Sequence, residues 1–552
     1  MRRLARFDHA HVWHPFTQMR DWLRREPIVI VSGRGAMLRD AHGREYLDAN
    51  SSIWTNLHGH NHPKLNAAIA RQLRKIAHSS ALGLANEPAS LLAERLVGIA
   101  NCRLPIADSA RPRAASENRQ SPIADRQLTK VFFSDDGATA MEVALKLAYE
   151  FARRARGLKR PRFLSLGGAY HGDTVGAVSL GHIPRFHESW RGLTFKTDEV
   201  MAPYCYRCPF NRAKPERADA REYRRCNWEC VGEVEARFAT RSKRQDPFAA
   251  MVVEPLVQGA AGIIAHPQGW LRRVAEIVRG HASQLIADEV MTGFGRTGAG
   301  LEDGKTGKRE DGRAPPSRFP VFSSSLLLAT HHEGVQPDFL ALAKGLTGGY
   351  LPMAATLTTQ EVFDAFLGEH EEFKTFFHGH SYTGNQIGAA AALTSLQLLQ
   401  SPSSVRARRL LDAAMRRALK SLWMLPQVGD IRQVGLVAGV ELVRDWRTRE
   451  PFAVRERAGQ RVCEAMARRG VLTRPIGDVI VLMPPYCTTA VQAARMVDAL
   501  HDSIQELFPG KRGGRLEAAH SVLCAGHAKR TASPLTPALS PLRGEGARRT
   551  ST

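Results

Sequence analysis

Two short apolar stretches, each ending at a charged residue, constrain the fold of this chain most. Residues 285–287 read Leu-Ile-Ala and stop at Asp288, and residues 339–343 read Phe-Leu-Ala-Leu-Ala and stop at Lys344. Continuous apolar runs of this length are typical of strands that are buried on both faces of a parallel sheet. Ligands in open α/β folds bind at the carboxyl ends of such strands. We therefore expect an α/β protein that presents a carboxylate and an amine at one sheet edge.

This pairing of groups indicates a class of chemistry. A lysine can bind the aldehyde of pyridoxal 5'-phosphate (PLP) covalently, and an acid can keep the pyridine nitrogen protonated, so that the ring accepts electrons. Taken alone, a strand-end Asp is more often a helix cap or turn former, and a Lys-Gly pair is more often a solvated loop. The interpretation therefore depends on the segments that accompany Asp288 and Lys344.

A turn at residues 134–139, Ser-Asp-Asp-Gly-Ala-Thr, is suited to hold a phosphate group. It follows an apolar stretch and begins a segment, residues 140–153, whose apolar residues recur at helical spacing. The small residues Gly137 and Ala138 let an anion approach the N–H groups at a helix start, where the helix dipole also favours it. An ordinary strand–turn–helix connection with an Asp cap would have the same sequence pattern.

Two further loops are rich in groups that could contact a cofactor. Residues 168–174 read Gly-Ala-Tyr-His-Gly-Asp-Thr, and Tyr170 could lie flat against a planar ring, although a packed loop tyrosine would look the same. Residues 377–385 are dense in hydroxyl, imidazole and glycine. Such a composition suits either a loop around an anion or a plain polar turn.

In their order along the chain, these motifs resemble those of the class III aminotransferases, which are PLP enzymes of fold type I. The four motifs are Tyr-His-Gly-Asp-Thr at 170–174, Ile-Ala-Asp-Glu-Val-Met-Thr-Gly-Phe-Gly-Arg-Thr-Gly at 286–298, Lys-Gly-Leu-Thr-Gly-Gly at 344–349 and His-Gly-His-Ser-Tyr-Thr-Gly-Asn at 378–385. The resemblance extends from about residue 7 to about residue 508. It implies a large domain with a mostly parallel seven-stranded sheet, a small α/β domain, and a homodimer with shared active sites.

The resemblance also implies roles for the residues that contact the cofactor. Lys344 matches the lysine that binds PLP and carries protons, Asp288 the acid at the pyridine nitrogen, and Tyr170 the aromatic residue stacked on the ring. Gly137 and Ala138 match the phosphate-binding turn, where Ala138 can offer only its backbone N–H.

Further positions match groups at the subunit boundary and on the substrate side. His380 and Ser381 match a pair that reaches the phosphate in the neighbouring subunit. Arg474 matches the arginine that binds a substrate carboxylate, a task suited to a planar bidentate donor. The other substrate-side matches are Phe16, Ile53, Trp54, Asp173, Arg296 and Gly379.

Three more segments, residues 12–19, 51–63 and 472–477, narrow the resemblance to the branch of the family that aminates 8-amino-7-oxononanoate to 7,8-diaminononanoate in biotin biosynthesis, by ping-pong transamination. The amino donor stays open between S-adenosylmethionine and lysine. Phe16, Ile53 and Val481 stand where users of S-adenosylmethionine carry Tyr, Trp and Tyr, and a sulfonium cation gains from aromatic faces. This favours the lysine-using branch.

Two alternative functions remain. One is that of another omega-aminotransferase, acting on a diamine or an omega-amino acid, and the other is that of a non-catalytic PLP-fold binding module.

The composition agrees with a large cytosolic enzyme, and the resemblance implies a small-molecule amino donor and keto acceptor as its partners. A formal charge of +23 would ordinarily suggest a nucleic-acid partner, but much of the excess is scattered arginine and part lies in the tail after residue 510. No run approaches the roughly 20 apolar residues of a membrane span, and the basic start lacks the apolar stretch of a signal peptide. We expect a cytoplasmic protein with no nucleic-acid or membrane partner.

The chain is expected to divide into four parts. Residues 1–60 are the N-terminal segment of the small domain, 61–400 the large PLP-binding domain, 401–510 the C-terminal small domain and 511–552 a disordered, low-complexity tail. Two polar segments without hydrophobic period, residues 103–127 and 301–325, are predicted to be insertions.

Four of the eight cysteines occur as two close pairs, Cys205 with Cys208 and Cys226 with Cys230. Pairs at these spacings can build a tetrahedral zinc site. Four reduced thiols are the default prediction, because the family's chemistry needs no metal and a cytosolic chain makes stable disulfides unfavourable. The closely spaced His58, His60 and His62 are expected to form hydrogen bonds rather than a metal site.

Overall fold

The computed structural model describes residues 2–102, 126–298 and 327–509. The predicted tail, and nearly all of the two predicted insertions, lie outside the described residues. The described residues up to Pro509 form one compact unit, so the predicted boundaries near residues 60 and 400 stay a prediction.

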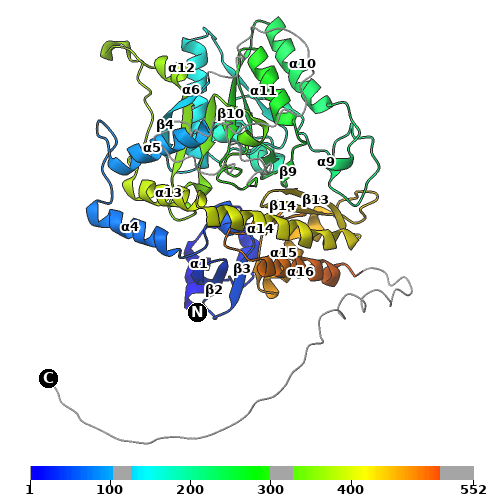
Figure 1. Ribbon diagram of the computed structural model, residues 1–552. Helices are drawn as coiled ribbons and strands as arrows, with labels where there is room; N and C mark the ends of the chain where they lie inside the picture. The colour runs from blue at the N-terminus through cyan, green and yellow to red at the C-terminus, as the bar shows by residue number, and fades with distance from the viewer. Residues whose placement is uncertain (1, 103–125, 299–326, 510–552) are drawn as a thin grey trace, which may run out of the picture. The chain divides into compact units, whose positions relative to one another are not determined.

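A seven-stranded sheet occupies the centre of the molecule (Figure 1). The strand order is β4 (Leu128–Ser134), β12 (Ala354–Thr359), β11 (Phe339–Leu342), β10 (Gln284–Asp288), β7 (Phe248–Val253), β5 (Arg162–Leu166) and β6 (Asp198–Val200). The strands from β11 to β6 pair in parallel, and β12 runs antiparallel to both of its neighbours. The predicted mostly parallel seven-stranded sheet is confirmed.

The two apolar stretches are adjacent parallel strands, which brings their carboxyl-terminal charges to one edge of the sheet. In the pairing of β10 with β11, Ile286 lies opposite Phe339 and Asp288 opposite Ala341. Helix α6 (Gly137–Arg154) packs on the sheet face that carries Ile286, and α10 (Glu229–Lys243) and α11 (Trp270–Gly280) pack on the face that carries Leu285. Because helices cover both faces, neighbouring strand residues are buried alternately on opposite sides, which explains why these strands are apolar throughout.

Two four-stranded sheets lie beside the central sheet, and one of them joins the beginning of the chain to its C-terminal part (Figure 1). One contains β1 (Ile30–Arg34), β2 (Met37–Asp40), β3 (Glu45–Asp48) and β15 (Val471–Leu472). The other contains β13 (Val428–Val434), β14 (Val437–Leu442), β17 (Val479–Leu482) and β16 (Pro475–Ile476). The parallel pairing of Leu47 with Val471 brings the N-terminal segment beside the region that carries Arg474.

The remaining elements surround these sheets. A short two-stranded sheet is formed by β8 (Val257–Gln258) and β9 (Ile264–Ala265). The other α-helical segments are α1 (Arg2–His11), α2 (Met19–Trp22), α3 (Ser51–Trp54), α4 (Pro63–Lys75), α5 (Glu87–Ala100), α7 (Val175–Ser179), α8 (Pro184–His187), α9 (Ala220–Tyr223), α12 (Gln360–Asp364), α13 (Gln386–Leu399), α14 (Pro402–Leu419), α15 (Ala458–Arg468) and α16 (Ala490–Leu507). Within the described ranges, no helix is both long and apolar enough to cross a membrane.

Candidate active site

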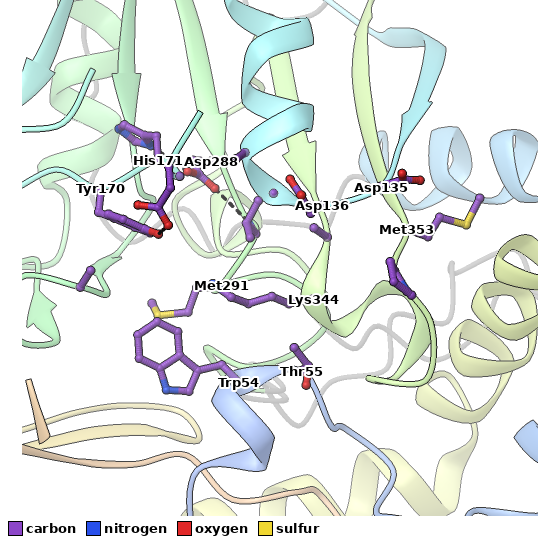
Figure 2. A pocket seen from close by; sticks show the side chains of 18 of the residues that line it. Trp54, Thr55, Asp135, Asp136, Tyr170, His171, Asp288, Met291, Lys344 and Met353 are labelled. Atoms are coloured by element: carbon purple, nitrogen blue, oxygen red, sulfur yellow. Dashed lines mark hydrogen bonds and ion pairs between the residues drawn. The ribbon is translucent and has the colours of Figure 1, made fainter. Parts of the chain in front are cut away.

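Asp288 and Lys344 line one cavity at the carboxyl ends of β10 and β11. The cavity has a volume of about 730 Å³, and its wall includes Gly137, Ala138, Trp54, Tyr170 and Asp173. Figure 2 shows Asp288 above Lys344 and Trp54 below it. The structure therefore brings together the predicted lysine, acid, aromatic residue and phosphate turn, which come from four separate parts of the chain.

Lys344 is half-buried and its amine lies over an aromatic ring. The Nζ atom is 4.9 Å from the centroid of the Trp54 ring, and the backbone of Lys344 has a left-handed φ of 39°. Burial lowers the pKa of the Lys344 amine, although the charges of Asp288 and Glu254 act in the opposite direction. A lower pKa leaves more of the amine neutral, which is the form that attacks a carbonyl carbon.

Trp54 is presented by a left-handed turn. The four residues of α3, Ser51–Trp54, all have positive φ, between 47° and 68°. Such a conformation costs roughly 1–2 kcal/mol for each residue with a side chain. It is held by the surrounding structure, since the Ser51 hydroxyl donates to the Met483 carbonyl at 2.7 Å and the Trp54 indole N–H donates to Asn50 at 2.8 Å. Strain of this kind at a cavity wall is typical of positions where the placement of one side chain matters.

Asp288 has a buried partner that the sequence interpretation missed. His171 Nδ1 lies 2.7 Å from Asp288 Oδ2, and no described residue contacts His171 Nε2 by a hydrogen bond. Burial acts to lower the pKa of His171, but the hydrogen bond and charge of Asp288 outweigh it, so the net shift is upward. The hydrogen bond therefore fixes the orientation of the Asp288 carboxyl group. The position of His171 next to Tyr170 in the motif was the available signal.

A second missed residue is Glu254, directly after β7. It accepts hydrogen bonds from the backbone N–H groups of Gly259 at 2.7 Å and Tyr170 at 3.3 Å, and it lines the cavity. The stretch before it, residues 248–253, is apolar throughout. The pattern that predicted Asp288 and Lys344, an apolar strand ending at a charge, therefore also applies to Glu254.

Glu254 should make the stability of the protein depend on pH. Burial raises the pKa of its carboxyl from 4.5 to about 7. A carboxyl whose folded-state pKa is raised stabilises the folded state fully below its unfolded pKa, and this contribution is lost as the pH rises through the folded pKa. The free energy of unfolding should therefore fall between about pH 5 and pH 8, by at most about 3 kcal/mol.

Denaturant unfolding across this pH range, for the wild type and Glu254→Gln, measures the effect. The variant should show a flatter dependence on pH, because its amide does not titrate. If the variant shows the same change of unfolding free energy with pH as the wild type, the pH dependence comes from other groups near Glu254. His171 is one such group, because its pKa is also raised in the folded state.

The predicted phosphate turn begins α6. Asp136 caps the helix by accepting the Thr139 N–H at 2.8 Å, and the Thr139 hydroxyl accepts the Asp136 N–H at 3.0 Å. The N–H groups of Gly137 and Ala138, at the first two helical positions, have no acceptor within the helix. A Cβ atom at Gly137 would lie 2.6 Å from Val290, and one at Gly172 would lie 2.3 Å from the Ala138 Cβ. The turn thus depends on small residues and leaves two donors for an anion, so the residues present fit the phosphate of PLP.

The predicted substrate-side residues lie in two groups. Phe16 packs edge-on against Tyr170, with centroids 6.4 Å apart, and the Arg474 guanidinium lies 5.8 Å from the Phe16 ring. Phe186 also contacts Phe16 edge-on, at 5.4 Å. The Tyr170 hydroxyl donates to Asp173 at 2.7 Å. These contacts connect Tyr170 in the cavity wall, through Phe16, to Phe186 and Arg474.

The other group is not brought to the cavity. Arg296 is buried and donates to the carbonyls of Pro484 at 2.8 Å and Asn56 at 3.2 Å, so its guanidinium is engaged inside the protein. A substrate-side role of Arg296 stays a prediction. Ile53 and Gly379 are exposed and are absent from the cavity wall.

The predicted subunit-boundary pair lies at the surface of this chain. His380 Nδ1 is 3.5 Å from Asp135 Oδ2, and Asp135 lines the cavity. Ser381 is exposed, and its carbonyl lies 2.6 Å from His78 Nε2. A role of His380 and Ser381 in a neighbouring subunit stays a prediction.

Of the three closely spaced histidines that were predicted to form hydrogen bonds, His58 and His60 do so, whereas His62 Nδ1 has no hydrogen-bond partner among the described residues. His58 Nε2 lies 3.0 Å from the Ser395 hydroxyl, and His60 Nε2 lies 2.9 Å from Asp48 Oδ2. Over the part of the chain that the structure describes, no three or more His, Cys, Asp or Glu side chains are positioned to coordinate a metal ion together.

A family model and curated relatives match this chain over most of its length and agree on the protein family. Residues 19–304 and 324–504 match the family model of aminotransferase class-III. A curated adenosylmethionine-8-amino-7-oxononanoate aminotransferase from Geobacter sulfurreducens is 43% identical over 507 residues, which cover 92% of this chain and 98% of the relative. One from Methanocaldococcus jannaschii is 37% identical over 503 residues, covering 91% and 98%.

Solved structures are similar over the same extent. The crystal structure of the Methanocaldococcus jannaschii enzyme matches with a TM-score of 0.75 at 36% identity, covering 92% of this chain and 99% of that one. An amine transaminase from an uncultivated Pseudomonas species, in its PLP-bound form, matches with a TM-score of 0.74 at 30% identity, covering 90% and 98%.

Proposed function

The chain belongs to the class-III aminotransferases, and on that basis we propose that it aminates 8-amino-7-oxononanoate to 7,8-diaminononanoate, a step of biotin biosynthesis. The observation that carries this proposal is its similarity, over nearly the full length of both chains, to several curated enzymes named for that acceptor. The cavity supports it, because a lysine, an acid and a small-residue turn meet there as a PLP-dependent transamination requires.

Different residues around the cavity would bind different parts of PLP. Gly137 and Ala138 would bind the phosphate through their N–H groups, and Asp288, oriented by His171, would hold a proton at the pyridine nitrogen. When bound, PLP supplies an aldehyde that takes up the amino group and a ring that stores electrons from the substrate carbon. Lys344 Nζ would bind the aldehyde and move protons at the substrate carbon.

The cluster of Phe16, Phe186 and Arg474 suits the acceptor. 8-Amino-7-oxononanoate carries a carboxylate at the end of an unbranched apolar chain. The aromatic rings of Phe16 and Phe186 would contact the chain, and the Arg474 guanidinium would pair with the carboxylate.

The proposed amino donor is S-adenosylmethionine or lysine. Three positions, Phe16, Ile53 and Val481, differ from those of enzymes that use S-adenosylmethionine, and the structure shows where each of them lies. Of the three, Phe16 contacts site residues, Ile53 is exposed, and Val481 is buried in β17. The backbone N–H of Val481 donates to the Arg474 carbonyl at 3.3 Å, and its side chain belongs to the same apolar cluster as the cavity residue Met291. Phe16 is therefore the altered residue best placed to affect donor choice.

The test is formation of 7,8-diaminononanoate by the PLP-loaded enzyme with each donor separately, alongside the absorption change that each donor causes alone. Product with either donor supports the proposal and identifies the donor. No product with either, while another omega-amine changes the absorption, would assign the enzyme to a different branch of the family.

A substitution at Arg474 tests the binding mode of the acceptor. Arg474→Met should raise the KM for 8-amino-7-oxononanoate about 10- to 100-fold, because a charged hydrogen bond to the carboxylate is lost. Arg468→Met, which removes an exposed arginine paired with Glu506, is the matched control and should leave the KM unchanged. An unchanged KM in Arg474→Met would place the carboxylate elsewhere.

A further inference from the structure

The two cysteine pairs meet around one small cavity away from the active site. Cys205 and Cys208 lie in the turn after β6, Cys226 lies just before α10, and Cys230 lies in the first turn of α10. All four line a cavity of about 10 Å³. A space of this size accommodates about one water-sized sphere, and therefore also a single metal ion.

Asn211 holds the two pairs together. Its side-chain amide donates to the Cys205 carbonyl at 3.0 Å, and its backbone N–H donates to the Cys208 carbonyl at 3.2 Å. Its side-chain oxygen accepts the Arg225 N–H, next to Cys226, at 3.0 Å. The backbone that carries both pairs is thus positioned by contacts that do not involve the sulfur atoms.

The charges around the cavity suit an anionic cluster. Arg224 Nη1 lies 3.2 Å from the Cys226 sulfur, and the Arg224 guanidinium lies 4.0 Å from the Trp228 ring centroid. A zinc ion bound by four thiolates carries two negative charges, and Arg224 would offset part of them. Arg273 lies 4.7 Å from the same ring and adds a second cation nearby.

We propose that Cys205, Cys208, Cys226 and Cys230 bind one structural zinc ion through their four sulfur atoms. Binding breaks four S–H bonds, forms four Zn–S bonds and releases four protons to solvent. The four cysteines line the cavity, but among the described residues no three side chains are yet close enough together to coordinate one metal ion. The half-buried Cys208 and Cys226 would therefore close onto the ion, while the buried Cys205 and Cys230 form the inner side.

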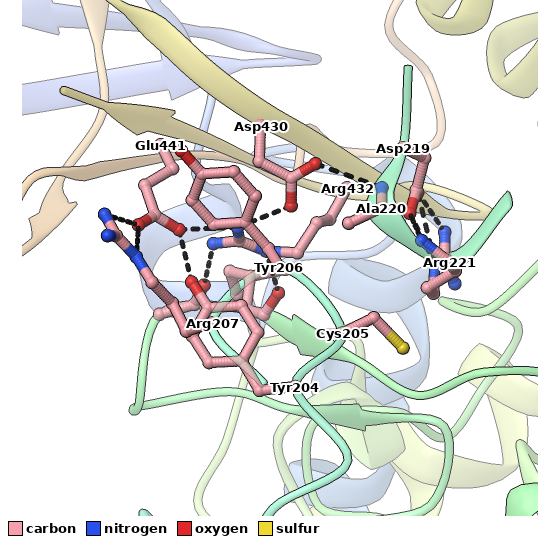
Figure 3. Close-up of polar contacts among 12 residues, drawn as sticks. Tyr204, Cys205, Tyr206, Arg207, Asp219, Ala220, Arg221, Asp430, Arg432 and Glu441 are labelled. Atoms are coloured by element: carbon pink, nitrogen blue, oxygen red, sulfur yellow. Dashed lines mark hydrogen bonds and ion pairs between the residues drawn. The ribbon is translucent and has the colours of Figure 1, made fainter. Parts of the chain in front are cut away.

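The ion would stabilise a loop that packs on the second four-stranded sheet. Between the cysteine pairs, Arg217 donates to the carbonyls of Trp423 and Val428, each at 2.6 Å. Figure 3 shows Cys205 beside this interface, where Arg207 donates to Glu441 at 2.7 Å. A zinc ion that closes the loop would hold these arginine contacts in place, so we expect it to affect stability rather than transamination.

Metal analysis of the PLP-loaded protein, purified without chelator, tests the proposal. We expect about one zinc per chain. Cys208→Ser and Cys226→Ser should each lower the zinc content at least about tenfold. Cys102→Ser, an exposed cysteine outside the cluster, should keep it. The cofactor absorption of each variant reports that the active site has folded, so zinc loss is distinguished from misfolding.

Three results would overturn the proposal. One is a wild-type zinc content no higher than that of the cysteine variants, together with four cysteine thiols that react with a thiol reagent after unfolding. Another is a disulfide between any two of the four, found by mass spectrometry. The third is a different metal bound stoichiometrically at these cysteines. None of these depends on which amino donor or acceptor the enzyme uses.

Discussion

Replacing Lys344 with alanine is expected to lower the turnover number at least about 1,000-fold, because proton transfer by a positioned amine alone contributes 10²–10⁴-fold. The structure places the Lys344 amine in the cavity over Trp54, where burial lowers its pKa. A methyl group can neither bind an aldehyde nor move a proton. Steady-state turnover of the PLP-loaded protein measures the loss.

The matched control is Lys243→Ala, which removes an exposed lysine at the end of α10. It should keep the wild-type rate. The absorption spectrum of Lys344→Ala distinguishes lost chemistry from lost cofactor, since PLP held only by non-covalent contacts absorbs differently from PLP bound to a lysine. A Lys344→Ala enzyme that keeps more than a tenth of the wild-type turnover would show that another group carries the proton.

The sheet and its edge could be predicted because they depend on local patterns. Apolar runs that end at Asp288 and Lys344 indicate buried parallel strands wherever they occur, and β10 and β11 confirm them. The same pattern at Glu254 was missed because PLP chemistry does not call for a second carboxylate. Its partners are backbone N–H groups of Tyr170 and Gly259, which no sequence pattern displays.

The side-chain contacts of the site depend on tertiary structure and could not be predicted in the same way. The left-handed turn at Ser51–Trp54 contains no glycine, so its backbone conformation follows from contacts with distant residues such as Met483. Arg296 lies in a family motif, yet its guanidinium donates to the carbonyls of Pro484 and Asn56. The motif match therefore did not indicate which groups the Arg296 side chain contacts.

The cysteine pairs illustrate an intermediate case. The spacing of Cys205, Cys208, Cys226 and Cys230 left zinc and free thiols as open alternatives. The structure adds that all four reach one cavity and that Asn211 links the two backbones. Spacing alone limits which cysteines can form a pair, whereas the approach of one pair to the other depends on the packing of the loop.

Asp288→Asn is expected to lower kcat/KM at least about 100-fold, since an amide cannot hold a proton at the pyridine nitrogen by charge. His171→Phe should have a smaller effect, about 10-fold, because it removes the hydrogen bond that orients Asp288 but keeps the carboxylate. Both are measured by steady-state kinetics of the PLP-loaded proteins, with Asp412→Asn, a carboxylate on α14 paired with Arg416, as the control.

The pH dependence of the cofactor absorption separates a positioning role of His171 from simple packing. If His171 supports the charge of Asp288, His171→Phe should shift the titration of the bound cofactor toward that of Asp288→Asn. Loss of activity with an unchanged titration would mean that His171 contributes only to packing. Wild-type kcat/KM in Asp288→Asn would remove Asp288 from the chemistry altogether, and with it the reason for a carboxylate and an amine to share this edge of the sheet.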